Sequence, residues 1–126
     1  MKVLVVEDED LVRELAVARL EAAGFEVIEA ASGEGALETA DGGADAVVVD
    51  IGLPGELDGW DVAERLRANS PELPVVYASG GEATDRRDVP GSRYLRKPCT
   101  AEAVIVAICE QVASTPQASD KPEDER

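Results

Sequence analysis

The sequence of 126 residues contains no histidine and only two cysteines, Cys99 and Cys109. The cysteines lack C-x-x-C spacing, and no histidine accompanies them. Structural zinc sites need such ligands and disulfide frameworks need regular cysteine pairs, so neither kind of site is indicated. A reducing cytoplasm is the expected setting.

Basic residues are also scarce, with 12 Lys and Arg against 27 Asp and Glu and a formal net charge of −15. Nucleic-acid binding draws mainly on clusters of Lys and Arg. The composition therefore argues against a nucleic-acid partner, and no nucleic-acid-binding residues are expected.

Long hydrophobic runs are missing as well. The apolar run at the start of the chain, Val3 to Val6, ends at Glu7. It is too short for a signal peptide or a membrane span. We expect a soluble cytoplasmic protein without a membrane partner.

What the chain does contain is an alternation of short apolar segments with helical patterns. The predicted strands cover residues 2–6, 25–30, 46–50, 75–78 and 92–96. Ser32, Asp58 and Thr100 are suited to cap the helices that begin after them. Parallel strands joined by helical crossovers form a sheet covered on both faces. The sequence predicts one doubly wound α/β domain with a five-stranded parallel sheet.

Two helices carry apolar residues at helical spacing, which predicts their buried faces. In the first helix these are Leu11, Leu15, Ala18 and Ala22. In the last helix they are Ala101, Val104, Ile105, Ile108 and Val112. The stretch from Glu82 to Gly91 is polar and holds Pro90, so a helix there would have one or two turns at most. Residues 114–126 have the composition of a disordered acidic tail, which leaves 1–113 as the domain.

The apolar run from Ala46 ends abruptly in Asp50, which turn-forming residues follow. Loops at the carboxyl ends of parallel strands are where open α/β sheets bind ligands. Taken alone, Asp50 is explained as the cap of a strand. Its importance depends on which other residues reach the same edge of the sheet.

Four strand ends are predicted to meet at that edge, and they carry Glu7, Asp8, Asp50, Ser79 and Lys97. Three carboxylates held together repel one another, and a divalent cation would relieve that repulsion. Oxygen ligands without nitrogen or sulfur favour Mg²⁺, which also accepts a phosphate oxygen. The group predicts a magnesium site that binds a phosphoryl ligand.

Each member also has a simpler explanation. Glu7 and Asp8 are suited to the positive end of the first helix, Ser79 to a turn, and Lys97 to a solvated position before Pro98. The joint occurrence of all these residue types at the right strand ends favours the functional interpretation.

From Val3 to Val112 the sequence resembles the receiver domains of two-component response regulators, of the type of the stand-alone chemotaxis regulator. The resemblance rests on matched motifs: Val-Val-Glu-Asp at 5–8, Val-Asp-Ile-Gly-Leu-Pro-Gly at 49–55, Asp58-Gly59, Ala78-Ser79-Gly80 and Tyr94-Leu95-Arg96-Lys97-Pro98. It implies a flavodoxin-like fold with strand order 2-1-3-4-5.

By this resemblance, Asp50 accepts a phosphoryl group from a histidine kinase or histidine phosphotransferase in a Mg²⁺-dependent reaction. Asp8 and Asp50 would ligate the ion directly, Glu7 mainly through water, and Gly52 by its backbone carbonyl. Lys97 would answer the charge of the phosphoryl group.

The resemblance also implies a switch in which Ser79 moves towards the phosphoryl group and Tyr94 turns inward behind it. Tyr94 is alternatively a half-buried strand aromatic. The bond before Pro98 is expected to be cis, and the kinase is expected to dock at the first helix and the turn from Pro98 to Thr100.

The sequence departs from the family pattern in two places. The segment between Ser79 and Lys97 is short, so the fourth helix of the family should be short or irregular. The stretch from Pro74 to Gly81 is similar to the signature of the FAT GUY receivers. The loop carrying Gly55, Glu56 and Leu57 is one residue longer than usual.

The expected function is that of a single-domain regulator that signals through an unknown partner protein and is not itself an enzyme with a separate output domain. Haloacid-dehalogenase phosphatases and Toprim nucleases need a second acid two residues after the first, where Gly52 stands. A Mg²⁺-dependent aspartyl-phosphate phosphatase is therefore a lesser alternative. The other alternative is a receiver-like binding module that is never phosphorylated.

Overall fold

The computed structural model describes residues 1–40, 43–81 and 86–113. The predicted acidic tail, 114–126, lies outside these residues, as do residues 82–85 of the short segment before the last strand. None of the described helices has the length and apolar character needed to cross a bilayer.

The described chain forms five strands and four helices in alternation, except where β4 leads to β5. The strands are β1 (Lys2–Val6), β2 (Glu26–Ala30), β3 (Ala46–Asp50), β4 (Val75–Ser79) and β5 (Arg93–Arg96). The helices are α1 (Asp10–Ala22), α2 (Gly33–Ala40), α3 (Gly59–Asn69) and α4 (Ala101–Ala113). All strand pairs are parallel, and their order is β2-β1-β3-β4-β5. The predicted fold and strand order are confirmed.

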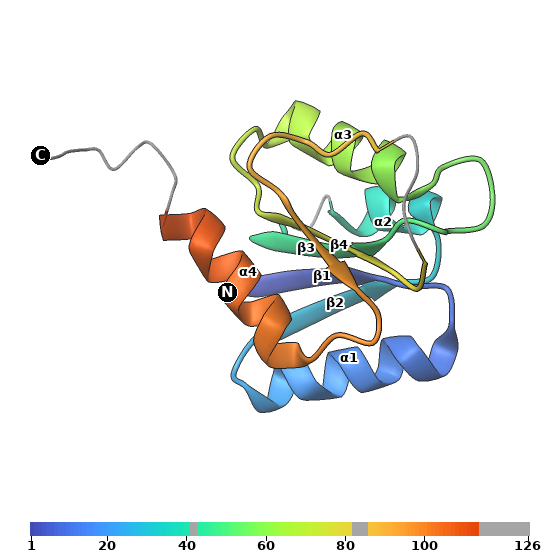
Figure 1. Cartoon of the computed structure of the whole chain (residues 1–126). Coiled ribbons are helices and arrows are strands. Elements are labelled where there is room, and N and C mark those ends of the chain that lie inside the picture. Colours follow the sequence, from blue (N-terminus) through green and yellow to red (C-terminus); the bar gives the residue numbers. More distant parts are fainter. Residues whose placement is uncertain (41–42, 82–85, 114–126) are drawn as a thin grey trace, which may run out of the picture.

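The sheet is covered on both faces, with α1 and α4 on one side and α2 and α3 on the other (Figure 1). Alternate strand residues supply the two cores. Val3, Val5 and Val76 pack towards α1 and α4, whereas Leu4, Val47 and Tyr77 pack towards α2 and α3. Strands buried on both faces explain the continuous apolar runs in the sequence.

The predicted helix caps are present. The Oγ of Ser32 accepts from the Gly35 N–H at 3.0 Å, and the Oγ1 of Thr100 accepts from the Ala103 N–H at 3.0 Å. Asp58 forms a capping box with Asp61, in which each side chain accepts from the backbone N–H of the other. These bonds satisfy donors that the first turn of a helix leaves open.

The predicted buried face of α1 is wrong. Leu11 and Leu15 are 81% and 52% exposed, and the face against the sheet is formed by Leu20 with Ala16 and Val17. Apolar residues lie on two sides of this helix, so spacing alone fits either face. Contact with Val3 and Val5 of β1 selects the side that carries Leu20.

In α4 the predicted position of Val112 is also wrong, because its side chain is 46% exposed and Gln111 is buried instead. The Gln111 amide accepts from the Val75 N–H at 2.9 Å and donates to the Val75 carbonyl at 2.8 Å. Buried backbone groups need hydrogen-bond partners. The pairing of β4 with β5 begins at Val76, opposite Arg93, so β5 supplies no partner for Val75. The Gln111 side chain thus satisfies the backbone groups of the first residue of β4.

The connection from β4 to β5 contains no helix in its described parts, residues 80–81 and 86–92. We call residues 86–91 the strap. Val89 is buried in the core with Tyr77, whose hydroxyl accepts from the Val89 N–H at 3.1 Å. Arg87 ties the strap to α3 by donating to Asp61 at 2.7 Å and to Glu64 at 2.8 Å. Residues 86–89 form neither helix nor strand, and these contacts hold them to the core and to α3.

Replacing Arg87 by Gln should loosen the strap. The Arg87 hydrogen bond holds the pKa of Asp61 below its ordinary value of 3.8. A lowered folded-state pKa gives stability that is present above the unfolded pKa and is lost as pH falls through the lower folded value. At neutral pH the variant should exchange the Val89 amide roughly two- to fivefold faster.

Hydrogen-exchange NMR measures this effect. Arg65→Gln, which removes an equal charge from an exposed position on α3, is the control. The difference between Arg87→Gln and wild type should shrink below about pH 3.8, the ordinary pKa of Asp61. Equal Val89 exchange rates in the wild type and Arg87→Gln at neutral pH would contradict this role of Arg87.

Candidate functional site

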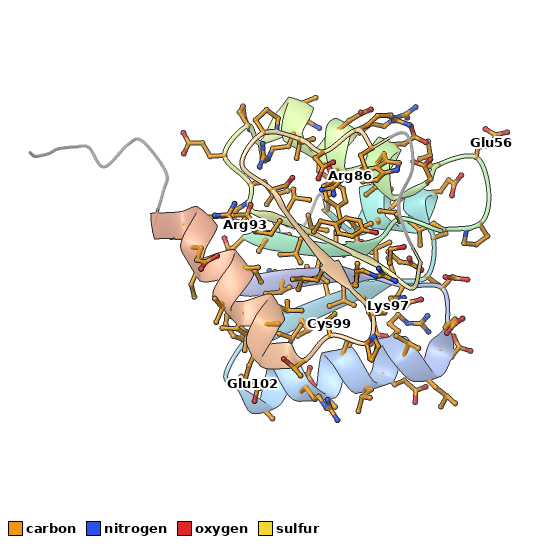
Figure 2. All side chains as sticks on the ribbon, in the orientation of Figure 1. Glu56, Arg86, Arg93, Lys97, Cys99 and Glu102 are labelled. Atoms are coloured by element: carbon orange, nitrogen blue, oxygen red, sulfur yellow. The ribbon has the colours of Figure 1, made fainter. Side chains whose placement is uncertain are left out.

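The carboxyl ends of β1, β3 and β5 bring three of the predicted residues into contact. The Lys97 ammonium forms an ion pair with Glu7 and lies 3.5 Å from the Asp50 Oδ2. Lys97 lies on the same side of the sheet as the loop between β3 and α3, which carries Glu56, and Arg93 lies towards the other end of β5 (Figure 2). Parallel pairing accounts for the convergence, since Val6 lies opposite Val49, and Asp50 opposite Ala78.

Glu7 is the most buried acid of the group, with 5% of its surface exposed. Its N–H donates to the Ala30 carbonyl at 3.0 Å, and its carboxylate accepts from the Glu9 N–H at 3.2 Å and from Lys97. Burial raises the pKa of Glu7, with the Lys97 hydrogen bond acting in the opposite direction. Burial works against the charge of Lys97, but the Glu7 hydrogen bond and the Asp50 charge outweigh it and raise the Lys97 pKa.

One carboxylate oxygen from each of Glu7, Asp8 and Asp50 lies within 4.8 Å of the other two. Glu7 is buried, Asp50 is partly buried and Asp8 is exposed, so the cluster opens to solvent on the Asp8 side. Hard oxygen donors at this spacing, with room for water, fit Mg²⁺. The donor chemistry predicted from the sequence is therefore present in the structure.

The backbone around Asp50 is closely packed. The Gly52 N–H donates to the Asp50 Oδ1 at 3.1 Å. On the other side, a Cβ added to Gly59 would lie 2.5 Å from the Ile51 Cα and 2.6 Å from the Asp50 carbonyl oxygen. Only glycine permits this approach, so the start of α3 rests directly on the end of β3.

Ser79 and Tyr94 share a single acceptor. The Ser79 Oγ donates to the Gly81 carbonyl at 3.2 Å, and the Tyr94 hydroxyl donates to the same oxygen at 3.1 Å. The guanidinium carbon of Arg86 lies 4.4 Å from the centre of the Tyr94 ring. Tyr94 is half-buried, and the Lys97–Pro98 peptide bond is cis.

An apolar groove with a volume of about 430 Å³ is lined by residues of α1 and α4 and by members of the predicted site. Its lining includes the apolar side chains of Val12, Leu15, Leu20 and Val104 and the charged side chains of Glu7, Asp50 and Lys97. The unexpected exposure of Leu15 is explained by its place on this groove. Cys99 also lines it, and burial raises the pKa of the Cys99 thiol.

Sequence reasoning missed three features that shape the site. Arg13 donates to the Glu7 carbonyl, Gly59 packs on Asp50, and Gly81 joins Ser79 to Tyr94. The glycine after the Asp58 cap was a usable signal, because glycine at the first position of a helix suggests a close backbone contact. The other two depend on tertiary geometry.

The chain matches the model of the response regulator receiver domain over residues 3–109. The sensor kinase CckA of Brucella abortus is 36% identical over 117 residues, which cover 87% of this chain and 12% of that protein. The probable transcriptional regulatory protein TcrX of Mycobacterium tuberculosis is 32% identical over 111 residues, covering 84% of this chain and 47% of that protein. The chain spans less than half the length of either relative.

A solved receiver structure is also similar to this chain. The response regulator receiver protein from Sinorhizobium medicae aligns with a TM-score of 0.84 and 35% identity, covering 90% of this chain and 95% of that one. At this identity the likeness extends from the fold to the sequence.

Proposed function

Because the chain belongs to the family of response regulator receiver domains, we propose that it accepts a phosphoryl group on Asp50 from a histidine kinase or histidine phosphotransferase. The observation that carries the proposal is the convergence of Asp50 with two further carboxylates and the Lys97 ammonium at one end of the sheet. Receiver domains take phosphoryl groups from such donors and bind Mg²⁺ at an acidic pocket.

In the proposed step, an Asp50 carboxylate oxygen attacks the phosphorus of a phosphohistidine. The P–N bond breaks, and its electron pair leaves with the histidine nitrogen. Lys97 lies 3.5 Å from the Asp50 Oδ2 and would pair with the phosphoryl oxygens. Asp8, Asp50 and the Gly52 carbonyl would hold Mg²⁺, with Glu7 acting through water. The ion would neutralise the part of the phosphoryl negative charge that Lys97 does not neutralise.

The signal would pass through Ser79 and Tyr94. Phosphorylation would draw the Ser79 hydroxyl from the Gly81 carbonyl towards the new phosphoryl oxygens, and Tyr94 would then turn inward. Their shared acceptor supports this coupling. The strap and β5 would present the changed surface to a partner protein, which gives a two-state switch.

The donor protein would dock on the groove between α1 and α4. The groove is lined mainly by apolar residues, reaches Asp50, and carries the exposed Leu15. An apolar helix face from a kinase or phosphotransferase would cover it and hold the phosphohistidine near Asp50.

Several finer points stay predictions. They are action as a single-domain regulator without an enzymatic output, a place in the cytoplasm, and membership of the FAT GUY subgroup.

Amide NMR with beryllofluoride, a mimic of the acyl phosphate, tests the proposal. In the presence of Mg²⁺, wild-type shifts should change for the residues of the site, the strap and β5, and Asp50→Asn should show no such change. An unperturbed wild-type spectrum would instead favour the unphosphorylated binding module. Continuous release of phosphate from many phosphomonoesters would favour the phosphatase.

A further inference from the structure

We propose that Arg13 is a positioning residue for the turn Glu7–Asp8 and thereby sets the affinity of the acidic cluster for Mg²⁺. The inference rests on the proposed function, because it assumes that the cluster binds the ion. Arg13 lies in the first turns of α1, and its side chain is 15% exposed.

The Arg13 guanidinium joins three parts of the fold. Its Nη1 donates to the Glu7 carbonyl at 2.8 Å, its Nε to the Glu29 Oε1 at 3.1 Å, and its Nη2 to the Asp10 Oδ1 at 2.8 Å. A planar guanidinium with three partners has little freedom to rotate. It therefore fixes the Glu7 carbonyl relative to β2 and α1.

The Glu7 carbonyl belongs to the peptide unit that links Glu7 to Asp8. The Glu7 side chain has its own partners in Lys97 and the Glu9 N–H. Within the described residues, the Asp8 side chain makes no hydrogen bond or ion pair. Asp8 is therefore positioned through its backbone, which Arg13 holds at the Glu7 carbonyl and the Glu7 carboxylate holds at the Glu9 N–H.

The sign of the effect separates positioning from simple charge. Arg13 is a cation near a cation site, so removing its charge should by itself strengthen Mg²⁺ binding. Losing the bond to the Glu7 carbonyl should weaken binding, because the Asp8 ligand would no longer be held in place. Residues that orient metal ligands typically change metal affinity by about 10- to 100-fold when they are mutated.

The test is a Mg²⁺ titration of the full chain at constant ionic strength, followed by amide NMR shifts around the site. Arg13→Gln should weaken binding about tenfold. Arg13→Lys also loses the three-way contact but keeps the repelling charge, so it should weaken binding by about tenfold or more. Arg93→Gln is the matched control, because Arg93 also donates to a carbonyl, that of Gly91, and pairs with a glutamate, Glu110, but lies away from the site. Its affinity should stay within about twofold of wild type.

Urea unfolding without Mg²⁺ gives the stability of each variant separately. A purely structural role would lower stability and leave the affinity of the folded protein unchanged, which would overturn the inference. Equal or tighter Mg²⁺ binding by Arg13→Gln would overturn it as well. If Arg13→Gln does not fold, Arg13→Lys carries the test, and wild-type affinity in that variant overturns the inference. A wild type that shows no Mg²⁺-dependent shifts would overturn the proposed function together with this inference.

Discussion

Lys97→Ala should bind Mg²⁺ more tightly than the wild type and yet lose its response to phosphorylation. The Lys97 ammonium pairs with both Glu7 and Asp50, two of the carboxylates that would hold the ion, so it competes with Mg²⁺. The side chain is 24% exposed, so solvent screens the pair. Removing the Lys97 ammonium should make Mg²⁺ binding more favourable by about 1 kcal/mol, which lowers the Kd roughly fivefold.

The same substitution should destabilise the protein without Mg²⁺ by about 1 to 2 kcal/mol, because it leaves the buried Glu7 carboxylate without its positively charged partner. Saturating Mg²⁺ should restore most of that loss. The response to beryllofluoride should disappear, since among the described residues Lys97 is the cation that forms ion pairs with Glu7 and Asp50.

Urea unfolding with and without Mg²⁺, together with a Mg²⁺ titration, measures these effects. Lys2→Ala is the control, because the Lys2 ammonium lies 4.0 Å from a surface carboxylate of Glu26. It should change the free energy of unfolding by less than about 0.5 kcal/mol. Weaker Mg²⁺ binding in Lys97→Ala would mean that Lys97 supports the metal site rather than competing with it.

Gly59→Ala should disrupt the site by pushing the start of α3 against the backbone of Asp50. The new Cβ would meet the Ile51 Cα at 2.5 Å and the Asp50 carbonyl oxygen at 2.6 Å. Both are backbone atoms, so relief requires the start of α3 or the end of β3 to move. Overpacking of this kind costs about 3 kcal/mol. A shift of Asp50 should also slow phosphorylation by up to about 100-fold.

Gly80→Ala is the matched control, because a Cβ there would meet no atom within 4 Å. It should change the free energy of unfolding by less than about 0.5 kcal/mol. Thermal unfolding and the rate of phosphorylation by a small phosphodonor measure both variants. Wild-type stability in Gly59→Ala would show that the contact with Asp50 relaxes easily.

Most of the fold could be predicted because its signals are local. A buried strand is predicted by the apolar run Val47, Val48 and Val49. A helix cap is predicted by the Asp58 side chain and the residues around it. The buried face of α1 could not be predicted, because Leu11 and Leu15 match helical spacing as well as Leu20 does. The choice depends on contacts with β1, which lie outside any local window.

The members of the site could be predicted for a similar reason, since Asp50 and Ser79 end apolar strands, Glu7 and Asp8 come just after one, and Lys97 directly follows the last strand. Their supporting contacts could not. Gln111 reaches Val75, and Arg13 reaches Glu29, across long sequence separations. The buried Tyr77 reads as one more strand residue, and its hydroxyl gives no sign that it anchors Val89.

The central claim is that Asp50 is the phosphoacceptor in a Mg²⁺-dependent reaction. Intact-mass spectrometry after incubation with a small phosphodonor tests it most directly. The account predicts one phosphoryl adduct on the wild type, located on Asp50, lost when Mg²⁺ is chelated and absent from Asp50→Asn. An unmodified wild type, or an equal adduct on Asp50→Asn, would contradict it.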